Sequence, residues 1–136
     1  MKAQHRIALA VTLALIVLGS IACGGGNSTP AKAVQTAFSA VKNKDVKAFK
    51  SVIPKKSLDQ MEQAAKAQGK SVDDTIKQMF EFMDKDEIAK IPDKVETQNE
   101  NISGDTATIE VKDAKGQWQK VNLVKEDDGW KLAKGL

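Results

Sequence analysis

The chain has 136 residues, enough for one domain, with 21 basic and 18 acidic side chains and a net charge of +3. It contains one histidine, one cysteine and no tyrosine. The histidine, His5, and the only arginine, Arg6, both lie in the first six residues. The rest of the chain therefore cannot build a Ser-His-Asp or Cys-His catalytic site or a His/Cys zinc site, and no metal or cofactor is expected.

Residues 1–22 have the layout of a secretory signal peptide: a basic start, an apolar run over 7–18 and small residues before Cys23. The alternative is an uncleaved anchor, but a membrane-spanning helix needs about 20 apolar residues, more than residues 7–22 supply. We therefore predict cleavage before Cys23. The mature chain then keeps 19 lysines against 18 acidic residues, a balance that offers no basic stripe and argues against nucleic-acid binding.

Cys23 would become the first mature residue. Ile21, Ala22 and Cys23 resemble the lipobox of bacterial lipoproteins, although Ser20 stands where leucine is most frequent. The resemblance implies that Cys23 carries a diacylglyceryl group and fatty acyl chains such as palmitate, which attach the protein to a membrane of the cell envelope. Gly24 after the cysteine resembles lipoproteins sent to an outer membrane, if the host has one. The alternative is a secreted protein with a free thiol.

Residues 23–29 are rich in glycine and are predicted to be a flexible linker, with a single domain over 30–136. Four helices follow, each predicted from a start signal and an apolar stripe at helical spacing. Thr29, Asp45 and Ser71 are the predicted N-caps of three of them, and Ser57 to Gln60 has the form of a capping box. The predicted helices cover 30–43, 46–53, 57–68 and 72–83.

The fourth helix carries two methionines one turn apart, Met79 and Met83, which could be soft-metal ligands but fit a packed core stripe better. An acidic run follows at 84–87. It lacks the spacing of a calcium loop and is interpreted as a solvated helix end.

After Pro92 the apolar period changes to that of strands, most clearly over 106–111, with turn sequences on either side. Helices followed by a run of strands predict an α+β fold, with an antiparallel sheet packed on one side by the helices. The other strands are predicted over 94–102, 117–125 and 130–134.

The two tryptophans are the candidate contacts for a ligand or partner. Trp130 is predicted to anchor the last hairpin under the helices. Trp118 shares a strand face with Lys120, whereas Val121 takes the other face. Either a bulge near Gly116 inverts this strand, or Trp118 is partly exposed and available for stacking. Packing in the core is the alternative for both.

The stretch from 29 to 53, TPAKAVQTAFSAVKNKDVKAFKSVI, and the close of the chain, VNLVKEDDGWKLAKGL, resemble cystatin-like domains of the nuclear transport factor 2-like superfamily. The resemblance covers about residues 29–136. It implies a curved sheet wrapped around a long helix to form a cone, whose open end holds a ligand, an active site or only side chains, depending on the member.

Enzymes of this superfamily resembling ketosteroid isomerases or dehydratases use a carboxylate base, often with tyrosine or histidine. Both of these partners are absent from the mature chain. We therefore expect a non-enzymatic, lipid-anchored envelope protein that binds a small apolar ligand or another envelope protein. Catalysis by a lone carboxylate base and a purely structural homodimer are the alternatives.

Overall fold

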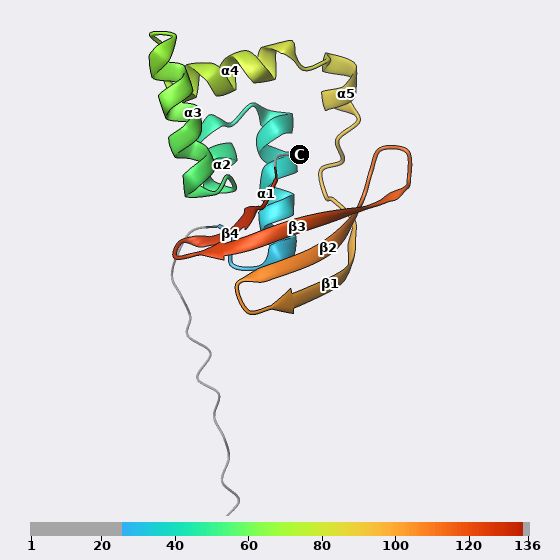
Figure 1. Cartoon of the computed structure of the whole chain (residues 1–136). Coiled ribbons are helices and arrows are strands. Elements are labelled where there is room, and N and C mark those ends of the chain that lie inside the picture. Colours follow the sequence, from blue (N-terminus) through green and yellow to red (C-terminus); the bar gives the residue numbers. More distant parts are fainter. Residues whose placement is uncertain (1–25, 135–136) are drawn as a thin grey trace, which may run out of the picture.

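The computed structural model describes residues 26–134, so the predicted signal peptide and Cys23 lie outside the described residues. The described part folds as helices followed by strands (Figure 1). The helices are α1 (Pro30–Asn43), α2 (Val46–Ser51), α3 (Lys55–Ala67), α4 (Val72–Phe82) and α5 (Lys85–Ala89). The strands are β1 (Thr97–Ser103), β2 (Thr106–Lys112), β3 (Trp118–Glu126) and β4 (Gly129–Leu132).

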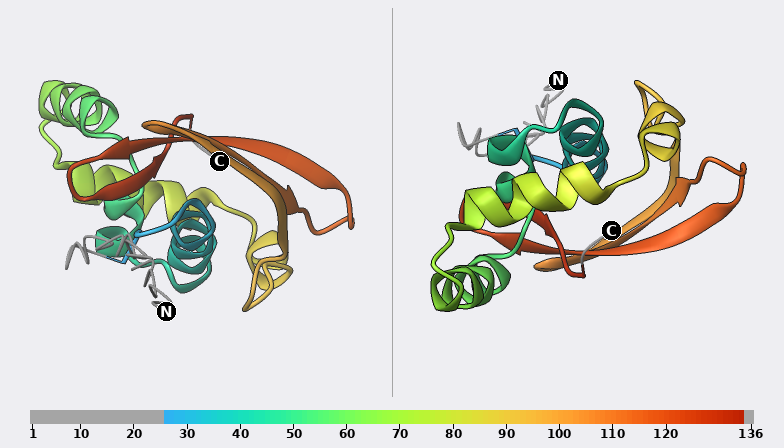
Figure 2. Two further views of the ribbon diagram at one scale, coloured as in Figure 1. Left: turned by 90° about the horizontal axis from the view of Figure 1, so that it is seen from below. Right: turned by 90° about the horizontal axis from the view of Figure 1, so that it is seen from above.

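The strands form one antiparallel sheet in the order β1-β2-β3-β4. The sheet is curved, and α1 lies on its concave side (Figure 2). The predicted α+β class, with helices packed on an antiparallel sheet, is confirmed. The register between β2 and β3 is regular from Thr106↔Val124 to Lys112↔Trp118, so no bulge inverts the start of β3.

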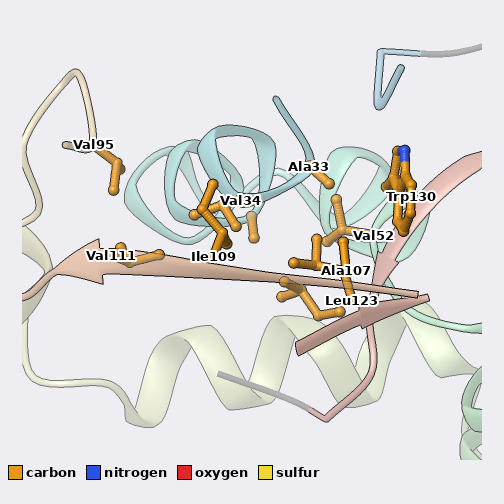
Figure 3. Close-up of a cluster of buried hydrophobic side chains, with 11 residues drawn as sticks. Ala33, Val34, Val52, Val95, Ala107, Ile109, Val111, Leu123 and Trp130 are labelled. Atoms are coloured by element: carbon orange, nitrogen blue, oxygen red, sulfur yellow. The ribbon is translucent and has the colours of Figure 1, made fainter. Parts of the chain in front are cut away.

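The main core lies between α1 and the concave face of the sheet (Figure 3). The alternation predicted for 106–111 is confirmed, because Ala107, Ile109 and Val111 of β2 are buried there. They meet Val34 of α1 and Leu123 of β3 in one cluster. This contact fixes the helix across the sheet.

A second core joins the helices to one another. Ile76 and Phe80 of α4 are fully buried in it, and the Phe80 ring meets Phe49 of α2 edge-on with centroids 5.3 Å apart. Met79 and Met83 are partly buried against the same cluster, as the core interpretation of this stripe predicts.

Three of the predicted helix starts are confirmed: the side chains of Thr29, Asp45 and Ser71 each accept a backbone N–H of the helix that follows. The predicted capping box at Ser57 is wrong, because α3 already begins at Lys55. The Lys55 N–H is instead satisfied by the carboxylate of Glu126 at 3.1 Å, a residue remote in sequence.

The acidic run at 84–87 does not end a helix; it begins α5, which the sequence pattern missed. Asp84 is the N-cap and its carboxylate accepts the N–H of Asp86 at 2.7 Å. The run is exposed, so its charges remain solvated.

The folded part begins earlier than predicted, at Asn27, which the sequence places in the flexible linker. Its side chain is 2% exposed and its Nδ2 donates to the Ser51 carbonyl at 2.9 Å. Its own carbonyl accepts the N–H of Trp130 at 2.9 Å. Asn27 belongs to the folded part because its backbone pairs with the outer edge of β4.

A candidate ligand groove between helix α1 and strand β3

A groove of about 460 Å³ lies where the concave face of the sheet extends beyond the end of β4. Its apolar surface comes from Phe38 of α1, Val111 of β2 and Val121 of β3. Lys134 also lines the groove, and Lys120 lines it at the edge of β3. Ligand sites in proteins typically have a volume of roughly 300–1,000 Å³ and combine an apolar lining with a few polar groups. The remaining lining residues are Asp113, Gln119 and Asn122.

Two hollows of similar size, about 520 and 500 Å³, lie along α3. They are lined mainly by lysines and carboxylates, several of which neutralise each other. Lys50 contacts Asp73 at 2.8 Å, and Lys131 contacts Asp128 at 2.7 Å. These surfaces present paired charges to water, so the groove beside β3 is the stronger candidate for an apolar ligand.

Asp113 is the carboxylate that lines the groove, and its hydrogen bonds come from the turn that follows it and from the start of β3. It accepts the backbone N–H groups of Gln117 and Lys115, each at 2.9 Å, and the side-chain amide of Gln119 at 3.2 Å. The Gln117 hydrogen bond is the main cause that lowers the pKa of Asp113 below its ordinary value. Asp113 is therefore an anion that holds the β2–β3 turn.

Trp118 lies outside this groove, on the convex face of the sheet. Side chains alternate along a strand, and Leu123, five residues later, is buried on the concave face. Trp118 is 39% exposed, and the Lys112 ammonium lies 5.7 Å from its ring centroid. Of the two alternatives predicted for this strand, a bulge near Gly116 or a partly exposed Trp118, the structure thus shows the second, with a regular register.

Trp130 is 3% exposed and belongs to the main core, as predicted for the anchor of the last hairpin. It pairs with Lys125 and shares the concave face with Leu123. The two candidate tryptophans therefore lie on opposite faces of the sheet and do not form one site. Trp130 packs in the core and is not available for stacking on a ligand.

Sequence reasoning missed the groove residues. Phe38 belongs to the apolar stripe of α1, a pattern that predicts burial, but it is only partly buried at the edge of the main cluster. Nothing in the local pattern separates a core position from one that faces a hollow. Phe82, at the end of α4, is 88% exposed and was also missed. The sequence does indicate this exposure, because Phe82 lies outside the apolar stripe that contains Ile76 and Phe80.

Among the side chains of residues 26–134, no group of three or more carboxylate, histidine or cysteine side chains is placed to hold a metal ion. None of the helices formed by these residues is long and apolar enough to cross a bilayer.

The described residues form a small α+β domain in which α1 packs on the concave face of the sheet and a groove lies between α1 and β3. A family model described as "Domain of unknown function (DUF4878)" matches residues 21–133, and the chain belongs to this family. No curated protein and no solved structure shows significant similarity to the chain.

Proposed function

We propose that this protein is a lipid-anchored domain of the bacterial cell envelope that binds an apolar or amphipathic ligand in the groove between α1 and β3, without catalysis. The observation that carries the proposal is the groove itself. It combines the apolar residues Phe38, Val111 and Val121 with two lysines, Lys134 and, at the edge of β3, Lys120. An apolar segment with an anionic group would bury its hydrocarbon part there and meet a positive charge at the rim.

The lipid anchor is proposed from the signal peptide pattern, Cys23 and the glycines that follow. Several acyl chains on Cys23 would hold the protein firmly, since each buried methylene contributes about 0.8 kcal/mol. The resemblance to cystatin-like domains of the nuclear transport factor 2-like superfamily supports the location of the ligand site, because members with ligands hold them in the open end of the curved sheet.

The catalytic alternative would need a carboxylate base with a raised pKa in a pocket. Asp113, the carboxylate of the groove, has a lowered pKa and accepts three hydrogen bonds from its own turn and the start of β3. This environment favours the binding function over an enzyme with a lone base. Trp118 remains a candidate contact for a protein partner or a second copy of the chain on the convex face.

The groove can be tested with a photoreactive medium-chain fatty acid added to the full-length protein in lipid nanodiscs. We expect cross-linked peptides that contain Phe38 or Val121. Val121→Trp fills the groove and should reduce this labelling about tenfold, whereas Leu58→Trp, in the hollows along α3, is the matched control and should not. Equal labelling of both variants would reject the groove as the ligand site.

The anchor can be tested by measuring the intact mass of the membrane-extracted protein. We expect a mature chain that starts at Cys23 and carries a diacylglyceryl group and an acyl chain. A Cys23→Ser variant should carry none of these lipid groups, so its mass should lack them. Recovery of that variant from the membrane at its full precursor mass would show that the leader, and not a lipid, is the main attachment.

A further inference from the structure

The outer edge of β3 is covered by another strand over only part of its length. β4 pairs with β3 from Leu123 to Glu126, and the Ala133 N–H donates to the Asn122 carbonyl at 2.9 Å. The backbone groups of one strand residue point to the same side, and neighbouring residues alternate. Because the backbone groups of Asn122 point toward β4, those of Lys120 and Trp118 point to the same side of β3, beyond the stretch that β4 covers. Within residues 26–134, neither residue has a hydrogen bond partner on that side.

The groove lies directly beside this open edge, since Val121 and Lys120 belong to both. A chain that paired with the open edge would alternate its side chains between the two faces of the sheet. On the concave face they would enter the groove beside Phe38 and Val121. The groove therefore favours apolar residues at every second position of an added strand.

The charges at this edge favour an acidic occupant. Lys120 and Lys134 form no ion pair among the residues that the structure describes. The Asp113 carboxylate already accepts hydrogen bonds from Lys115, Gln117 and Gln119. The Lys120 side chain lies on the convex face, where Glu110 is its cross-strand neighbour on the β2 side. Acidic residues of an added strand that alternate with apolar ones would meet its ammonium group from the other side.

We propose that the open edge of β3 binds an extended acidic and apolar peptide segment of another envelope protein as an added strand. The proposal rests on the proposed function, because it identifies the occupant of the same groove. A strand would satisfy the backbone groups of Trp118 and Lys120, which a fatty acid would leave open to water. Main-chain hydrogen bonds would then provide affinity, and the groove would select alternate side chains.

The test uses a fluorescein-labelled peptide with alternating glutamate and valine, titrated against the full-length protein in nanodiscs and followed by fluorescence anisotropy. Empty nanodiscs and a peptide with the two residue types in separate blocks are the controls. We expect saturable binding of the alternating peptide only. N-methylation of every second peptide nitrogen on the pairing side should weaken binding about tenfold, because it removes two main-chain hydrogen bonds.

Two variants of the protein separate backbone pairing from charge. Lys120→Pro removes the outward N–H and should weaken binding about tenfold. Lys120→Ala keeps that N–H and should lose only about threefold, the contribution of one exposed charge. Because the N-methylated peptide leaves the protein unchanged, the test does not depend on whether the proline variant folds.

Equal affinity for the parent and N-methylated peptides would overturn the added-strand proposal. So would labelling of the groove by the fatty acid without any binding of the peptide, which would identify a small amphiphile as the occupant and leave the proposed function intact. If Val121→Trp changes neither the fatty acid labelling nor the peptide binding, both the groove function and this inference are wrong.

Discussion

The outer edge of the sheet is formed by β4 at one end and by the first half of β3 at the other. The two ends differ in how their backbone N–H groups are hydrogen-bonded. On β4, the outward N–H groups of Trp130 and Leu132 donate to the carbonyls of Asn27 and Val52, at 2.9 and 2.8 Å. On the first half of β3, those of Trp118 and Lys120 meet no partner within residues 26–134. Among the described residues, the edge is thus paired next to Asn27 and unpaired beside the groove. Unpaired edges favour pairing with another chain, and this difference is the reason that we propose the groove end as the site of an added strand.

The two tryptophans lie at the two ends of this edge, Trp130 in β4 and Trp118 at the start of β3. Replacing Trp130 is expected to have the largest effect on the free energy of unfolding. Trp130→Ala should lower the free energy of unfolding by about 3–5 kcal/mol, because it leaves a cavity in the main core. Trp118→Ala should change it by less than about 0.5 kcal/mol, because the indole is partly exposed and its contact with Lys112 is weak there. Urea denaturation followed by circular dichroism measures both. Similar losses for the two variants would show that the convex face is covered in solution.

The closed edge depends on the absence of a side chain at Gly129. A Cβ there would lie 2.8 Å from the Asn27 carbonyl oxygen, and its φ of +125° is strained for other residues. Gly129→Ala should therefore lower the free energy of unfolding by about 2–3 kcal/mol, measured in the same way. Gly104→Ala is the control, since its φ is +58° but nothing lies near its Cβ. That variant should lose about 1 kcal/mol. A loss at Gly129 no larger than at Gly104 would show that Asn27 does not hold the edge.

The smallest expected effect is a pH dependence at the closed end. Lys131 is 3% exposed, and its ammonium group donates to the Ser51 carbonyl and to Asp128, each at 2.7 Å. The hydrogen bond from Lys131 lowers the pKa of Asp128, so this pair stabilises the fold above the ordinary aspartate pKa of about 3.9 and loses that contribution as pH falls below it.

Asp128 is largely exposed, and water screens the pair, so its contribution should stay below about 1 kcal/mol. Denaturation at pH 7 and pH 3 should show a smaller difference in Asp128→Asn than in the parent protein. Asp127→Asn removes a negative charge from the same turn and is the control. An unchanged difference in Asp128→Asn, or an equal reduction in both variants, would contradict the role of the Lys131 pair.

Local patterns were sufficient to predict most elements of the fold. The alternation of 106–111 predicted β2 with its buried face, and Thr29, Asp45 and Ser71 marked helix starts, because each signal depends on residues a few positions apart. The start of α3 could not be predicted in this way, since the group that caps it, Glu126, lies 71 residues further along the chain. The irregular register of β1 after Gln98 gave no sequence signal either.

The groove could not be predicted from the sequence either, because its residues are far apart along the chain. Phe38, Val121 and Lys134 come from three distant segments, and the hollow between them exists because β4 ends at Leu132 while β3 starts as early as Trp118. Periodicity shows which face of an element is apolar, but it does not show where the neighbouring element stops.

By itself, the sequence determined the α+β class, the apolar faces of the helices and strands, and the side-chain chemistry that residues 23–136 lack, because composition and periodicity are properties of single residues and near neighbours. Only the tertiary structure decided that Asn27 pairs with one end of the sheet edge and that, within residues 26–134, the other end is unpaired beside a groove. Both features depend on long-range contacts, in which backbone groups are satisfied by residues that no local pattern connects.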